Sequence, residues 1–158
     1  SALHNDQYER NKPRGGGLWT SSYRPNNEHI SAWVEWCHWN QFSTGTWGLW
    51  VLTPKLDARL LVIDSYDDLE LLHRTYGRSP GRFNVSFPDW PAIAADFDGV
   101  HLTENGHAET HLSHPLDLYG WDCESTVWFR WAFDSAERVG EITVAGYDYA
   151  ADEKGVLQ

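Results

Sequence analysis

The chain has 158 residues, of which 41% are hydrophobic and 22% are charged, which is enough for one globular domain with its own core. Its net charge of −11 weighs against nucleic acid as a partner, because holding a phosphate backbone needs clustered Lys and Arg. The sequence contains no apolar run of about 18 residues and no recognisable signal peptide, so we expect neither a membrane span nor export, and predict a cytoplasmic protein.

The N-terminal third predicts short strands and one helix. Residues 1–5 form a possible strand, and the polar stretch 6–17, which ends in three glycines, predicts a loop. Residues 18–21 have strand-type side chains. A helix is expected after Ser31, a typical N-cap residue, with an inner face built at positions i, i+3, i+4 and i+7 by Trp33, Trp36, Cys37 and Asn40.

The middle of the chain predicts two strands followed by a capped helix. The apolar runs 46–53 and 58–64 are typical of strands with a buried face. Ser65 precedes Asp68 by three residues, which is a capping signal. Apolar residues then continue at helical spacing until Gly77.

The last third predicts further short elements. Residues 90–97 favour one or two helical turns, residues 100–103 a strand, and a polar loop of about fifteen residues is expected to follow. Strands are predicted at 125–133 and 142–149. Because helices and strands mix without strict alternation, the pattern favours an α+β fold over a doubly wound parallel sheet.

Two carboxylates, Asp122 and Glu124, open the predicted strand at 125–133. Residues i and i+2 of a strand face the same side, so the two side chains are expected to project together. Such a pair can supply one carboxylate for charge stabilisation or for base work. A solvated turn before a strand is the alternative interpretation.

Asp122-x-Glu124 resembles the acid-x-Glu pair of the ADP-ribosyltransferase family, with Asp where many members have Glu or Gln. Trp19-Thr20-Ser21, followed by the helix after Ser31, is similar to the family's aromatic-Ser/Thr-Ser/Thr motif. His4 stands where the family has an Arg or His near the end of its first strand. Residues 89–100 also resemble a segment found in phage and bacterial relatives.

The resemblance implies one α+β domain over residues 1–158, with NAD bound as a substrate in a cleft between two small packed β-sheets with flanking helices. The implied reaction is mono-ADP-ribose transfer with release of nicotinamide, without a metal. Glu124 would hold the ribose 2′-hydroxyl and stabilise the ribosyl cation, and Asp122 would orient or deprotonate the nucleophile. The residues expected to contact NAD are His4, Trp19, Thr20, Ser21 and Trp33.

The acceptor of ADP-ribose is expected to be a protein or a small molecule rather than nucleic acid, since the chain is acidic. A mobile loop near residues 111–121 is expected to present it. The sequence does not predict an oligomeric state.

Other functions stay open at this point. The 10 Trp residues also suit a non-catalytic module that stacks on carbohydrate or another partner. A binding protein with the same fold and no turnover is a further alternative. Four histidines between residues 101 and 114 lie in a predicted loop without enforced metal geometry, and we interpret Cys37 and Cys123 as reduced, partly buried thiols.

Overall fold

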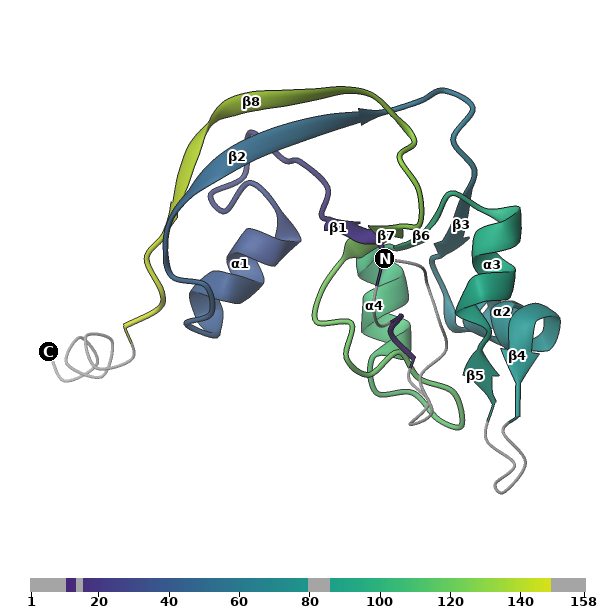
Figure 1. Ribbon diagram of the computed structural model, residues 1–158. Helices are drawn as coiled ribbons and strands as arrows, with labels where there is room; N and C mark the ends of the chain where they lie inside the picture. Colours follow the sequence, from purple (N-terminus) through teal and green to yellow (C-terminus); the bar gives the residue numbers. More distant parts are fainter. Residues whose placement is uncertain (1–10, 14–15, 80–85, 149–158) are drawn as a thin grey trace, which may run out of the picture.

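The computed structural model describes residues 11–13, 16–79 and 86–148, and these residues form a mixed fold of helices and small sheets (Figure 1). The strands are β1 (Leu18–Thr20), β2 (Gly45–Pro54), β3 (Leu60–Ile63), β4 (Gly77–Arg78), β5 (Phe87–Pro88), β6 (Gly99–Leu102), β7 (Ser125–Trp128) and β8 (Phe133–Val144). The helices are α1 (Ala32–Trp39), α2 (Tyr66–Tyr76), α3 (Trp90–Asp96) and α4 (Glu104–Thr110). The predicted α+β class is confirmed at this level. The strand expected at residues 1–5 lies outside the described residues.

The central sheet has the strand order β1-β7-β6-β3, with β3 and β6 parallel and the other neighbours antiparallel. One face of this sheet carries apolar side chains that pack with residues of the helices α2 and α3. The fully buried members of this core include Ile63, Leu69, Ile93, Val100 and Val127. Because side chains alternate along a strand, the polar residues of β6 and β7 are left on the opposite face.

A second, two-stranded sheet, the β2–β8 ribbon, lies on the side of that opposite face and stands away from most of it. Its strands pair antiparallel from Gly45 opposite Val144 to Pro54 opposite Phe133. In Figure 1 the ribbon curves as an arch from α1, on one side, over β1 to the central sheet. Near its junction with that sheet, Phe133 and Trp128 form a small apolar cluster against Leu52. The two sheets are therefore joined at one end and separate at the other.

The strand predicted at 46–53 forms, but the prediction of a well-buried face is wrong for it. Most of β2 is exposed, including Trp47 and Trp50. The ribbon has only two strands, so little of its surface lies against other elements. An apolar run in the sequence does not show which of its side chains will be buried against another helix or sheet.

The helix caps expected from sequence are present. Ser31 accepts a hydrogen bond from the Val34 backbone N–H at the start of α1, and Ser65 accepts one from Asp68 at the start of α2. The inner face of α1 is less aromatic than predicted, since Cys37 is buried whereas Trp33 is 39% exposed. Trp33 instead stacks on Trp36, with ring centroids 5.1 Å apart.

The region after β6 is a helix where a polar loop was predicted. Thr103 caps α4 by accepting from the Gly106 backbone N–H. Gly106 lies so close to the Ile63 carbonyl that a side chain would not fit there, so the helix packs through a glycine and Thr110 rather than through an apolar stripe. Hydrophobic periodicity cannot detect such a helix.

The C-terminal strand boundaries also differ from the prediction. The strand predicted at 125–133 ends at Trp128, and the one predicted at 142–149 already begins at Phe133. Residues 134–141 of the long strand β8 are mostly polar and mostly exposed, so they lack the apolar run that marks a buried strand. Among the described residues, no helix combines the length and apolarity needed to cross a bilayer.

Candidate functional site

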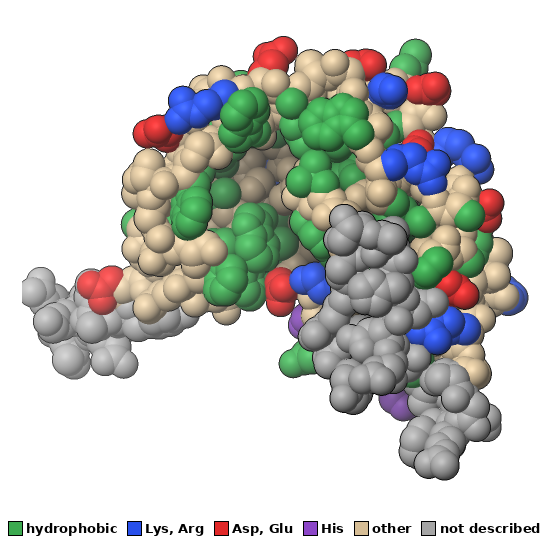
Figure 2. Space-filling view, viewed as in Figure 1, with side chains coloured by type: hydrophobic (Ala, Val, Ile, Leu, Met, Phe, Trp, Pro, Cys, Tyr) green, Lys and Arg blue, Asp and Glu red, His purple; other side chains and the backbone are tan. Residues whose placement is uncertain are grey.

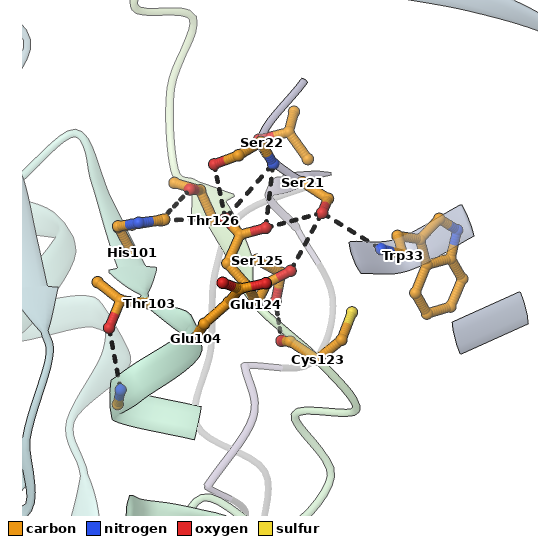
Figure 3. A network of polar contacts seen from close by, with 12 residues as sticks. Ser21, Ser22, Trp33, His101, Thr103, Glu104, Cys123, Glu124, Ser125 and Thr126 are labelled. Atoms are coloured by element: carbon orange, nitrogen blue, oxygen red, sulfur yellow. Dashed lines mark hydrogen bonds and ion pairs between the residues drawn. The ribbon is translucent and has the colours of Figure 1, made fainter. Parts of the chain in front are cut away.

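Glu124 immediately precedes β7, and its side chain is 3% exposed. Three groups that follow β1 donate to it: the Ser21 hydroxyl to Oε2 at 2.9 Å, the Ser22 hydroxyl to Oε1 at 2.8 Å, and the Ser22 backbone N–H to Oε2 at 3.1 Å (Figure 3). Antiparallel pairing of β1 with β7 brings these segments together across about 100 residues of chain. Burying a carboxylate is costly unless donors compensate it, so this arrangement fixes the orientation of Glu124.

Two further side chains approach the same carboxylate. An Arg24 guanidinium nitrogen lies 3.7 Å from Oε2, and His101 Nδ1 lies 3.7 Å from Oε1. Arg24 is itself held by Glu104 of α4, with a nitrogen to oxygen distance of 2.5 Å. Glu124 is thus enclosed by basic and hydrogen-bonding side chains from two segments of the chain, residues 21–24 and the strand β6.

Asp122 has different surroundings. Its Oδ2 lies 3.4 Å from Lys12 Nζ, and the same ammonium group lies 4.8 Å from the centre of the Trp19 ring. Asp122 and Glu124 line different hollows of the surface, because the chain bends at residues 123–124 before β7 begins. The two carboxylates therefore do not project into one space as strand alternation predicted.

The larger hollow, here called the aromatic cavity, has a volume of about 1030 Å³ and lies between the central sheet, α1 and the β2–β8 ribbon. Figure 2 shows the molecule hollowed beneath the arch, with hydrophobic side chains gathered around the opening. Its aromatic lining residues are Trp19, Tyr23, Trp33, Phe42, Trp50, Trp128 and Phe133. Ligand sites in proteins commonly measure about 300–1,000 Å³ and are mostly apolar, so the cavity has the size and lining for an extended organic ligand with flat rings.

The smaller hollow, here called the polar recess, has a volume of about 490 Å³ and holds Glu124. The rest of its lining is hydrophilic: Ser22, Arg24, Asn27, Asp64, His101, Thr103, Glu104 and Asn105. Ser22 and His101 line both hollows. The aromatic cavity and the polar recess therefore meet at a shared wall beside the Glu124 carboxylate.

The other residues expected in the site occupy varied positions. Thr20 and Trp33 line the aromatic cavity, although the Thr20 hydroxyl accepts a hydrogen bond from Trp128 Nε1 rather than contacting Glu124. Trp19 also lines the cavity, but its ring packs edge-on against buried Trp121 with centroids 4.8 Å apart. His4 lies outside the described residues.

Sequence reasoning missed Ser22, Arg24, His101 and Trp50. Ser22 directly follows the recognised Thr-Ser pair, so a one-residue extension of that motif would have found it. No local signal marks Arg24 or His101 as neighbours of Glu124, because they reach it only through strand pairing.

The remaining histidines near this region support the chain segment before Glu124. His107 Nε2 and His111 Nδ1 lie 2.9 and 3.2 Å from the Trp121 carbonyl oxygen. Burial and the neighbouring His111 lower the pKa of His107. Within the described parts of the chain, no group of three His, Cys, Asp or Glu side chains is placed to hold a metal ion.

Residues 111–121, expected to form a mobile loop, contribute to the core. Leu118 and Trp121 are fully buried, and the Leu118 backbone N–H donates to Thr110. This segment is thereby tied to α4 and to the main core.

Both cysteines are free and buried, in line with the prediction of reduced thiols. Burial, reinforced by the charges of Glu124 and Asp122, raises the pKa of Cys123 to about 12. Burial also raises the pKa of Cys37. A raised thiol pKa lowers the fraction of thiolate, the reactive form, at neutral pH.

Comparison with family models finds no match, and comparisons with characterised proteins and with solved structures find none either.

Proposed function

We propose that this chain is an NAD-dependent mono-ADP-ribosyltransferase in which Glu124 is the catalytic carboxylate. One observation carries the proposal: Glu124 is buried at the meeting point of two hollows and is held there by Ser21 and Ser22. The acid-x-Glu pair and the aromatic-Thr-Ser motif, on which the family resemblance rests, are therefore in direct contact. Their closeness follows from the antiparallel pairing of β1 with β7, and it places both motifs in one site.

The proposed reaction breaks the bond between the nicotinamide nitrogen and ribose C1. The bonding electron pair leaves with nicotinamide, which becomes neutral, and positive charge develops on the ribose. Glu124 stabilises that charge, because a preoriented carboxylate in a buried site acts more strongly than one in water. The acceptor then supplies an electron pair to C1 and loses a proton.

The two hollows suit the two reactants of this transfer. The aromatic cavity offers Trp33, Trp50 and Tyr23 as faces for the rings of NAD. The polar recess gives an acceptor a separate approach to Glu124. In this arrangement the reacting carbon lies at the wall shared by the two hollows.

Nicotinamide release tests the proposal. We expect the wild type to release nicotinamide from NAD, with or without added cell lysate as a source of acceptors. Glu124→Gln, which keeps the size of the side chain and removes its charge, is expected to lower the rate by about 10²- to 10³-fold. Calorimetry should still detect NAD binding to this variant.

Glu141→Gln is the matched control, because Glu141 lies on β8 with a largely exposed side chain paired to Arg138. It should release nicotinamide at the wild-type rate. A wild type that neither binds NAD nor releases nicotinamide, or a Glu124→Gln variant with full activity, would overturn the proposal.

The exposed tryptophans support one alternative, a non-catalytic module that stacks on carbohydrate. Trp47, Trp50 and Trp131 are 53%, 57% and 62% exposed, and exposed indoles are typical stacking surfaces for sugars. Titration of tryptophan fluorescence with soluble oligosaccharides and with NAD distinguishes the two functions. A response to oligosaccharide alone would favour the recognition module.

A further inference from the structure

His101 occupies the boundary between the two hollows. It lies on β6 directly opposite Thr126 of β7, on the sheet face that looks away from the main core. Its Nδ1 is 2.8 Å from Thr126 Oγ1 and 3.7 Å from Glu124 Oε1 (Figure 3). The imidazole is therefore beside the carboxylate that would stabilise the ribosyl cation, and it lines both hollows.

The neighbours of Nδ1 determine which nitrogen of the ring carries the proton. The negative charge of Glu124 favours a hydrogen on Nδ1, and the Thr126 hydroxyl oxygen accepts it. Nε2 then carries the free lone pair. Within residues 11–13, 16–79 and 86–148, Nε2 has no hydrogen-bond partner, so that lone pair is available to a reactant.

The other carboxylates that line the hollows are already engaged. They pair as Asp122 with Lys12, Glu104 with Arg24, and Asp64 with the Thr103 hydroxyl. Glu124 itself accepts hydrogen bonds from three groups, the Ser21 and Ser22 hydroxyls and the Ser22 backbone N–H. Asp122, the residue that the family resemblance assigns to the nucleophile, also lies outside the recess through which an acceptor would reach Glu124.

We propose that His101 is the general base of the transfer, an inference that rests on the proposed function. As the acceptor atom forms its bond to ribose C1, its proton passes to His101 Nε2. The bond from C1 to nicotinamide breaks ahead of this proton transfer, as the charge that Glu124 stabilises develops on the ribose, and its electron pair leaves with neutral nicotinamide. His101 then returns the proton to solvent. A positioned base of this kind contributes about 10²- to 10⁴-fold to a rate.

Azide distinguishes a base from a structural residue, because the azide anion attacks C1 without losing a proton. The probe reactions are NAD with water alone and NAD with sodium azide, which yields ADP-ribosyl azide. His101→Asn retains a side-chain donor for Thr126 and removes the base. We expect it to lose at least 10²-fold in the water reaction, to bind NAD as the wild type does, and to recover most of its rate with azide.

Glu124→Gln should not recover with azide, because the cation is left unstabilised. His29→Asn removes an imidazole that stacks on His38 and lines neither hollow, and it should match the wild type in both reactions. A folded His101→Asn variant that keeps the wild-type rate with water, or that stays inactive with azide, overturns the assignment. If the wild type itself releases no nicotinamide, the proposed function fails, which is a distinct result.

A second variant leaves the imidazole in place. Thr126→Val removes the oxygen that accepts from Nδ1, so the ring loses its preferred orientation and tautomer. We expect the water reaction to fall, but by less than the roughly 10²-fold expected for loss of the base itself, with the azide reaction unchanged. An equal fall in both reactions would contradict the role of His101 as a base.

Discussion

At the scale of single residues, the site consists of one buried charge and the groups that hold it. Glu124 and Ser21 were identified from sequence because each belongs to a short recognisable pattern. Arg24 and His101 were not, because their closeness to Glu124 results from strand pairing and from an ion pair with α4. A local sequence pattern thus predicted Glu124 as a candidate. The side chains that approach its carboxylate can be identified only from the tertiary structure.

Ser21→Ala is expected to lower the free energy of unfolding by about 1–3 kcal/mol, because the buried carboxylate loses a donor. The Ser21 hydroxyl also accepts from the Trp33 backbone N–H, so the start of α1 loses a contact as well. Urea unfolding measures the change. Ser135→Ala, on the exposed β2–β8 ribbon, is the control and should change stability by less than about 0.5 kcal/mol. Equal stabilities for the two variants would contradict the importance of this donor.

At the scale of helices and strands, the accuracy of prediction followed the strength of the local signal. The helix α2 was predicted to within a residue, because Ser65 supplies a cap and apolar residues recur at helical spacing up to Gly77. The helix α4 was missed, since Gly106 provides its contact with the sheet. The strand β8 was placed too late, because its polar residues pair with an equally exposed partner.

The hydrogen bonds that cap α2 make part of the free energy of unfolding dependent on pH. The Asp64 backbone N–H and the Ser65 hydroxyl hold the pKa of Asp68 below its ordinary value of 3.8. A carboxyl group with a lowered folded-state pKa stabilises the fold above its unfolded pKa, and this contribution disappears as the pH falls through the folded pKa.

Asp68→Asn is therefore expected to lower the free energy of unfolding at neutral pH by about 1 kcal/mol or less, since the group is partly screened by solvent. The difference from the wild type should shrink as the pH falls and vanish once the pH is below the lowered folded-state pKa of Asp68. Thermal unfolding at several pH values measures it. Asp67→Asn is the control, because Asp67 lies in the same first turn without these capping contacts. If Asp68→Asn lowers the free energy of unfolding by the same amount at every pH, the lowered pKa of Asp68 is not what stabilises the cap.

At the scale of the whole molecule, the aromatic cavity exists because the β2–β8 ribbon stands away from the central sheet. The two sheets touch through Trp128, Ala132 and Phe133, and the hollow opens beyond that junction. Sequence reasoning expected a cleft between two small sheets from the family resemblance. It did not predict the arch. The sequence of β2 has the apolar pattern of an ordinary buried strand, and only its pairing with β8 shows that it belongs to a separate, exposed ribbon.

Phe133→Ala tests whether this junction holds the cavity in shape. The Phe133 ring is 4% exposed and lies 4.5 Å from that of Trp128, centroid to centroid. Truncating a buried aromatic residue is expected to cost about 3–5 kcal/mol, and loss of the junction should weaken binding of NAD. Val139→Ala, at an exposed position of β8, is the control for both denaturant unfolding and calorimetry. If Phe133→Ala unfolds at the same denaturant concentration as this control, the junction is not what supports the arch.

The pairing of β2 with β8 determines the order in which parts of the chain can fold during synthesis. Gly45 must meet Val144 and β1 must meet β7, whereas the core between residues 60 and 128 contains the parallel pair and three helices. Contacts so distant in sequence form slowly, because closing long loops costs entropy before any contact is gained. The middle of the chain can therefore fold on the ribosome, while the cavity closes only after β8 has left the exit tunnel. The cavity is therefore complete only late in synthesis, once residues 133–144 are free to pair with β2.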